Sequence, residues 1–183
     1  RIVSSLAEVT EKIQQIDDHI GISFSGFFPD ARVLIDRARI YAQIHRLLYD
    51  EPILVETLAK RICDILQIYT QHGGVRPFGV ALLIGGVDDY GPQLIGAEPS
   101  GAYMKYYAHS LGSGESTIES ILEKEYRRDM SLEEAIQLAL KALKAVMEGN
   151  ISPERVELAV IDSETRRFRK FSFEEKRKLI EQL

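Results

Sequence analysis

The sequence has 183 residues, of which 45% are hydrophobic and 28% are charged. This composition is sufficient for the core of one globular domain and argues against disorder. The formal net charge is −5, so the sequence lacks the basic surface that a nucleic-acid-binding protein needs. A single cysteine, Cys63, excludes an internal disulfide. We therefore expect a cytoplasmic protein that does not bind nucleic acid.

The beginning of the sequence carries no secretory signal, because charged residues such as Glu8 and Lys12 interrupt it. The longest apolar run, 78–87, is about half of the ~20 residues that a membrane helix needs, so we expect no membrane partner. Residues 1–6 alternate like the end of a strand. This pattern predicts a fragment whose start lies upstream of Arg1.

The first elements are predicted to be a β-hairpin and a helical hairpin. Residues 12–16 and 19–26 alternate as two short strands around an Asp-Asp turn. A helical period follows Pro29, and a second amphipathic helix runs from Pro52 to the pair Gly73–Gly74. The short connection between these helices predicts that they pack against each other.

Three strands are predicted next. Residues 78–87 are too apolar for a strand with one wet face, so this strand should lie in the middle of a sheet that is covered on both sides. Turn residues at 88–92 and 99–101 separate it from strands at 93–97 and 102–111. The three strands should form a meander.

Two further helices are marked by capping boxes, in which a hydroxyl and a carboxylate satisfy first-turn amides. The pairs are Ser116 with Glu119 and Ser131 with Glu134. The second of these helices is expected to bury Leu132, Ala135, Ile136, Ala139, Leu143 and Val146. Residues 156–161 and 168–171 should form a final hairpin, and Ser172 with Glu175 should cap a last helix that runs to Leu183.

The resulting order is ββ, αα, βββ, αα, ββ, α. Paired strands that alternate with paired helices indicate an α+β fold with mostly antiparallel sheets. Two sheets packed together, with helices on each outer side, would cover the apolar central strand on both faces. The sequence has no repeat and no linker, so residues 1–183 are expected to form a single domain.

Few residues suggest catalysis or cofactor binding. The four histidines are far apart in the sequence and match no metal-binding pattern: His19, His45, His72 and His109. Cys63 lies among apolar helix residues and is expected to be buried. The glycine-rich turn at 112–116 could hold an anion on free amides, but it has no lysine, and Glu115 would repel phosphate. We expect no metal and no cofactor.

Two segments carry more constraint than a simple connection requires. Residues 69–80 place paired glycines, an Arg-Pro pair and a further glycine between a helix and the central strand. Residues 25–32 join a strand to a helix and present Phe27 and Phe28 in succession. Exposed apolar turn residues of this kind often mark contact surfaces.

With these two segments, the sequence resembles the α-subunits of the proteasome, most closely the archaeal ones. The resemblance covers essentially the whole chain and is carried by residues 10–13, 16–18, 25–26, 30–39, 69–71, 73–80, 99–101 and 123–127. It implies a four-layer αββα sandwich of the N-terminal-nucleophile hydrolase type. It also implies a seven-membered α-ring that caps the β-ring, guards the passage of unfolded substrates and docks a regulatory ATPase. Proteolysis in this family belongs to β-subunits, whose first residue is a catalytic threonine.

The resemblance also assigns site residues. Lys12, with Gly26 and Phe27 nearby, matches the pocket between neighbouring subunits that receives the C-terminal carboxylate of an activator's tail, and an ammonium group suits that carboxylate. The narrow entrance annulus is matched by His72, Gly73, Gly74, Val75, Arg76, Pro77, Phe78 and Gly79.

The sequence departs from the family in two ways. The given sequence has no match to the family's N-terminal helix, its gating tail and its first strands, as expected of a fragment whose start lies upstream of Arg1. The family also usually has tyrosine at the position of His72, and a ring of imidazoles would make the entrance sensitive to mild acid. Two alternatives remain open: a catalytic β-type relative of the same fold, and a stand-alone small-molecule enzyme that uses the turn at 112–116.

Overall fold

A computed structural model describes residues 11–183. The strand end expected at 1–6, and Thr10, lie outside the described residues. The strands are β1 (Ile13–Asp17), β2 (Ile20–Gly26), β3 (Val80–Asp88), β4 (Gly91–Ala97), β5 (Tyr103–Tyr106), β6 (Ala159–Ile161) and β7 (Phe168–Lys170). The helices are α1 (Phe28–Tyr49), α2 (Val55–Gln71), α3 (Glu115–Glu125), α4 (Leu132–Val146) and α5 (Phe173–Ile180). This order confirms the predicted alternation of paired strands and helices.

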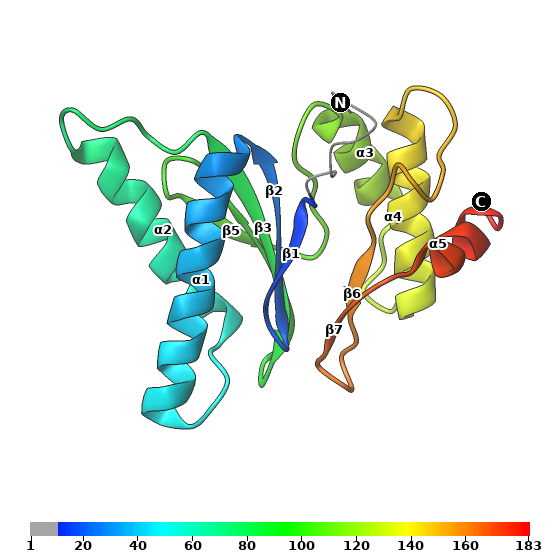
Figure 1. Cartoon of the computed structure of the whole chain (residues 1–183). Coiled ribbons are helices and arrows are strands. Elements are labelled where there is room, and N and C mark those ends of the chain that lie inside the picture. The colour runs from blue at the N-terminus through cyan, green and yellow to red at the C-terminus, as the bar shows by residue number, and fades with distance from the viewer. Residues whose placement is uncertain (1–10) are drawn as a thin grey trace.

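The elements are arranged in four layers (Figure 1). Helices α1 and α2 cover one face of an antiparallel sheet with the order β1-β2-β3-β4-β5. The hairpin β6-β7 lies on the other side of that sheet, and α3, α4 and α5 lie beyond it. The predicted α+β sandwich is confirmed, and β3 occupies the middle of the larger sheet as expected.

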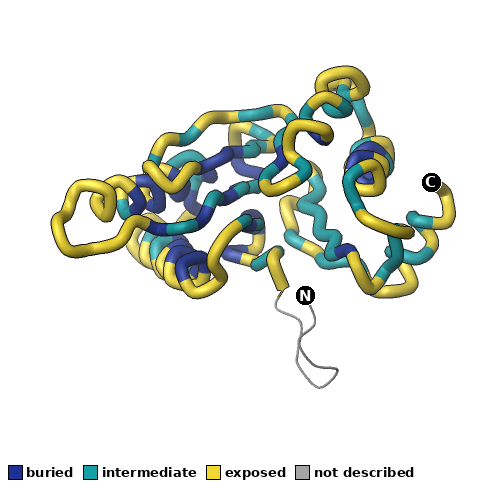
Figure 2. Tube along the Cα trace, turned by 90° about the horizontal axis from the view of Figure 1, so that it is seen from above, coloured by how far each residue is buried: buried dark blue, intermediate teal, exposed yellow. Residues whose placement is uncertain are grey.

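The main core lies between the larger sheet and the helices α1 and α2, where Figure 2 shows most of the buried residues. Leu34, Ala38 and Ala42 recur at four-residue steps on α1 and are fully enclosed. The alanines allow the helix to approach the sheet closely, and the alternating side chains Leu82 and Ile84 of β3 meet it from the other side. The pattern that predicted these elements is therefore also the pattern that buries them.

A smaller core joins α4 to the β6-β7 hairpin and α5, and here one prediction was wrong in part. Ile136 and Leu140 are buried in this cluster, whereas Leu132, Ala139 and Leu143, expected to be buried, are exposed, the two leucines by 41% and 37%. The reason is that α4 turns a different stripe toward β6-β7. Leu143 instead lines a cavity of about 620 Å³ between α4 and the larger sheet.

Two further differences from the predictions lie close to Glu119. Its Oε1 atom accepts hydrogen bonds from the backbone N–H and the hydroxyl of Ser110 at 2.6 and 2.9 Å. The strand predicted to run to Leu111 ends at Tyr106. The carboxylate is also not free to cap its own helix, so the expected box with Ser116 is absent and Gly114 is the N-cap of α3.

The other two capping boxes are confirmed. Ser131 with Glu134 caps α4, and Ser172 with Glu175 caps α5. The last hairpin is shorter than predicted, since β6 begins only at Ala159. Before it, the carbonyl oxygen of Val156 accepts a hydrogen bond from the ammonium group of Lys176 at 2.9 Å, so a side chain engages the backbone there.

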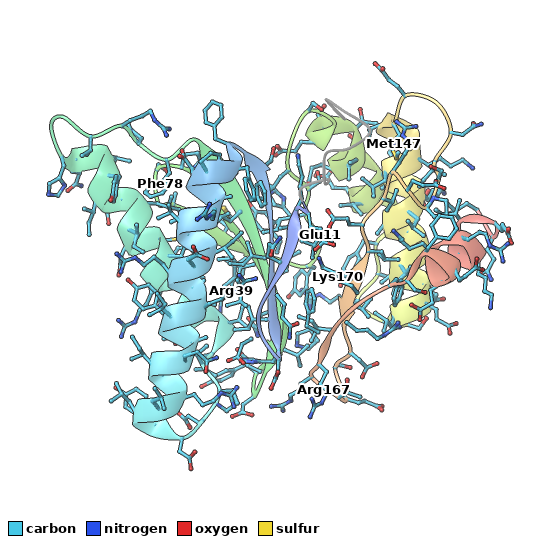
Figure 3. All side chains as sticks on the ribbon, in the orientation of Figure 1. Glu11, Arg39, Phe78, Met147, Arg167 and Lys170 are labelled. Carbon is cyan, nitrogen blue, oxygen red and sulfur yellow. The ribbon has the colours of Figure 1, made fainter. Side chains whose placement is uncertain are left out.

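Polar contacts connect the two halves of the molecule. The backbone N–H of Phe168 donates to the carbonyl oxygen of Asp18 at 2.6 Å. The ammonium group of Lys170 pairs with the carboxylate of Glu11, and these two side chains face each other between the layers in Figure 3. Within residues 11–183, the helices are too short or too polar to cross a membrane.

Candidate functional site

The two constrained segments of the sequence meet in space at the corner where β2 gives way to α1. Gly26, the last residue of β2, pairs with Val80 of β3 and has φ +125°. A Cβ atom at this position would lie 2.2 Å from the carbonyl oxygen of Gly79. Glycine is therefore required here by both conformation and space.

The N-terminus of α1 holds the base of the loop that joins α2 to β3. The backbone N–H of Phe27 donates to the Gly79 carbonyl at 3.0 Å. The Asp30 carboxylate accepts from the Gly79 N–H at 2.7 Å and from both Nη atoms of Arg76 at 2.8 Å. This bidentate contact fixes the orientation of the Arg76 guanidinium relative to the Asp30 carboxylate as well as the distance between them.

The electrostatics of the corner follow from these bonds. Hydrogen bonds from Arg76 and from the Gly79 amide hold the pKa of the Asp30 carboxyl below its ordinary range. The same carboxylate raises the pKa of the Arg76 guanidinium. Both groups stay ionised near neutral pH, and Asp30 is buried at 8% exposure.

Aromatic rings surround this ion pair. Phe27 and Phe28 are 65% and 39% exposed, which confirms the expectation from sequence, and the Arg76 guanidinium lies 5.9 Å from the Phe27 ring centroid. Phe78, which is labelled in Figure 3, is buried, and its ring meets that of Tyr69 of α2 edge to face, with 4.7 Å between the ring centroids. The base of the loop thus has one inward-facing anchor and one aromatic surface that faces solvent.

The tip of the loop is open. Gly74 has φ +85°, and added Cβ atoms at Gly73 and Gly74 would meet no heavy atom within 4 Å. His72 is exposed, and its Nδ1 atom lies 2.8 Å from the carbonyl oxygen of Ile68 at the end of α2. The segment 72–79 therefore has a projecting tip and a fixed base.

Lys12 is bonded elsewhere: among residues 11–183, no hydrogen bond or ion pair joins it to this corner. It is exposed, and its backbone N–H donates to Glu157 at 2.7 Å. Together with Ser25, the residue before Gly26, it lines the cavity between the larger sheet and α4. A pocket built from Lys12, Gly26 and Phe27 stays a prediction.

The other candidates have structural explanations. The turn at 112–116 is packed against α4, where a Cβ atom at Gly114 would lie 2.9 Å from the side chain of Val146. Cys63 is buried at 4% exposure, and burial raises its pKa to about 11, with a further contribution from Asp64. Within residues 11–183, no three histidine, cysteine, aspartate or glutamate side chains gather closely enough to hold a metal ion.

The sequence patterns identified the segments 69–80 and 25–32 but did not predict that these two segments contact each other. Asp30 was not assigned to the site, although an acidic residue in the first turn of a helix that follows Pro29 is a recognisable signal. Its partner Arg76 lies 46 residues further along the chain. The structure brings together the ion pair of Asp30 with Arg76 and the exposed rings of Phe27 and Phe28. Such a surface suits the binding of another protein chain.

Comparison with known proteins agrees with these features. The profile of the proteasome subunit family matches residues 1–161. The chain is 51% identical over 185 residues to a proteasome subunit alpha of Methanocaldococcus jannaschii, covering 100% of this chain and 70% of the relative. It is 50% identical over 184 residues to that of Thermococcus sibiricus, with the same coverage. It is 50% identical over 173 residues to that of Methanothermobacter thermautotrophicus, covering 94% and 70%. The chain belongs to the proteasome subunit family and is similar to its archaeal alpha subunits.

Proposed function

We propose that this chain is a non-catalytic subunit of the outer α-ring of a 20S proteasome core particle. The observation that supports this most strongly is the identity of about half of all residues to proteins named proteasome subunit alpha, over the whole chain. The catalytic β-type alternative is disfavoured by the same names. The stand-alone enzyme is disfavoured because the turn at 112–116 is a packed connection.

In this role the chain would assemble with copies of itself, or with other α-type chains, in a seven-membered ring on top of a β-ring that carries the catalytic threonines. The loop 72–79 would line the entrance through which unfolded proteins pass, and Lys12, Gly26 and Phe27 would receive the tail of a regulatory ATPase. The particle would be cytoplasmic. The acid sensitivity expected of a His72 ring stays a prediction.

Native mass spectrometry of the protein purified from its source, with the denatured chain mass recorded from the same sample, tests the assembly. The expected result is a particle that contains this chain in a seven-fold multiple, alone or together with β-type chains. A closed ring of identical chains needs a head-to-tail interface. The rotation that this interface imposes between neighbouring subunits must bring the last subunit back into contact with the first. A full-length chain that stays monomeric at micromolar concentration would overturn the proposal.

A further inference from the structure

The base of the loop 72–79 is bonded to the start of α1 by its polar contacts, while its buried Phe78 packs against Tyr69 of α2. Its polar contacts within the described residues, apart from one between Arg76 and the neighbouring Pro77 carbonyl, end on Phe27 and Asp30. The last rungs of the β2-β3 ladder, at Gly26 and Val80, join the same two segments. These bonds join the corner between β2 and α1 to the base of the loop, so a displacement of the corner would act on the loop through them.

Phe27 is placed to receive such a displacement. One face of its ring lies against Gly79, where an added Cβ atom would be 2.5 Å from a ring carbon. The Arg76 guanidinium is within cation–π range of the ring, and 65% of the residue remains exposed to solvent. A ligand that binds against the exposed side of the Phe27 ring would therefore act on Gly79 and Arg76 at the loop base through that ring.

The Asp30 side chain is buried and the Arg76 side chain is exposed, and this difference suits a rigid connection between α1 and the loop. The Asp30 side chain is 11% exposed and the Arg76 side chain is 66% exposed. Asp30 is thus held within the first turn of α1, and the exposed Arg76 side chain extends from the loop to contact it. A planar guanidinium that holds both carboxylate oxygens resists rotation, which a single lysine contact does not.

We propose that Asp30 and Arg76 are positioning residues that transmit occupancy of the tail-binding surface at Gly26 and Phe27 to the entrance loop. This inference rests on the proposed function, because it needs a bound activator tail and a loop that lines the entrance. It assigns to the ion pair the coupling between the two sites, and not the affinity for the tail.

The test uses the full-length chain assembled with its β-type partner, an archaeal proteasomal ATPase and fluorescently labelled unfolded casein. The rate of casein degradation is measured against ATPase concentration. Each particle then yields a half-maximal ATPase concentration and a maximal stimulation relative to its own unstimulated rate. The variants are Lys12→Ala, Arg76→Gln, Arg76→Lys and, as a control, Asp89→Asn. Asp89 pairs with Arg166 at 2.8 Å on another part of the surface.

Arg76→Gln should lower the maximal stimulation about fivefold, within the range of typical couplings between sites, while the half-maximal concentration stays the same. Arg76→Lys should lie between Arg76→Gln and the parent, since it keeps the charge and loses the fork. Lys12→Ala should instead raise the half-maximal concentration about tenfold, because the tail carboxylate loses its partner. Asp89→Asn should match the parent in both quantities.

Two results would overturn the inference alone: Arg76→Gln that matches the parent, or Arg76→Gln that shifts the half-maximal concentration as Lys12→Ala does. A parent-like Lys12→Ala would overturn the proposed tail pocket, and the inference with it. Native mass spectrometry of each particle verifies assembly. Since Arg76 is exposed and Arg76→Lys keeps the positive charge, the lysine variant carries the test if the glutamine variant does not assemble.

Discussion

The ring of Phe168 on β7 lies directly over Gly21 on β2, where an added Cβ atom would stand 2.7 Å from a ring carbon. Gly21 is opposite Gly85 in the ladder between β2 and β3, and Gly85 has open space on the same test. The Phe168 ring therefore packs against the sheet at Gly21, and the cross-strand neighbour Gly85 is a matched site without that contact.

Gly21→Val should destabilise the protein by about 1–3 kcal/mol, because it forces Phe168 away from the sheet and overpacks the contact between the layers. Gly85→Val introduces the same side chain next to it and should be neutral or stabilising, since valine favours strands. Urea unfolding of both variants checks this. Equal free energies of unfolding for the two would show that the Phe168 contact does not hold the layers together.

Gly26→Ala and Gly74→Ala should separate two kinds of glycine requirement. Both positions have positive φ, so each substitution carries backbone strain of about 1–3 kcal/mol. At Gly26 the added Cβ atom also meets the Gly79 carbonyl at 2.2 Å, whereas at Gly74 it meets nothing. The thermal midpoint should fall further for Gly26→Ala, and the reverse order would contradict the description of the corner.

Asp30→Asn should remove part of the acid sensitivity of stability. A carboxyl whose folded-state pKa is lowered stabilises the fold above its unfolded pKa of about 3.9, and that stabilisation is lost as the pH falls through the folded pKa. The difference in free energy of unfolding between parent and variant should therefore be constant from about pH 7 to pH 5 and shrink below about pH 4.

Denaturant titrations at several pH values measure this difference. Arg76→Gln serves as the matched variant, because it keeps the carboxyl and removes the largest cause of its lowered pKa. Its curve should lie between those of the parent and Asp30→Asn below about pH 4. Parallel curves for all three proteins would show that the pair contributes nothing to acid unfolding.

Ser131→Ala should cost about 1 kcal/mol, since the Ser131 hydroxyl accepts a hydrogen bond from the Glu134 N–H in a complete capping box. Ser116→Ala is the control, because α3 has Gly114 as its N-cap and no side-chain cap hydrogen bond. Its free energy of unfolding should stay within about 0.5 kcal/mol of the parent. If Ser116→Ala lowered the free energy of unfolding as much as Ser131→Ala does, the capping box expected from sequence at Ser116 would be present after all.

Cys63 should be unreactive in the folded protein. Its pKa is raised to about 11 by burial, so near neutral pH the group is a protonated thiol, and it is 4% exposed. Reaction with Ellman's reagent should be slow in native buffer and rapid in denaturing urea. Rapid stoichiometric labelling of the folded protein would show that α2 opens locally.

Most elements could be predicted because their signals are local. The apolar period of α1 and α2 and the unbroken apolar run of β3 mark both the element and its buried face. One failure, the absent capping box of α3, occurred where a side chain binds outside its own element. Glu119 has the spacing of a capping residue, but it binds Ser110 of the preceding segment, and no property of residues 116–119 alone reveals that choice.

The sequence by itself determined the fold class, the order of the elements and the two segments that form the candidate site, because hydrophobic periodicity, glycine and proline act over a few residues. Only the tertiary structure decided that these segments meet, with Asp30 as the partner of Arg76 across 46 residues. The physical reason is that the pairing of β2 with β3 brings the segments that carry Asp30 and Arg76 together. The partners of this ion pair are then selected by the register of the sheet, which no local pattern specifies.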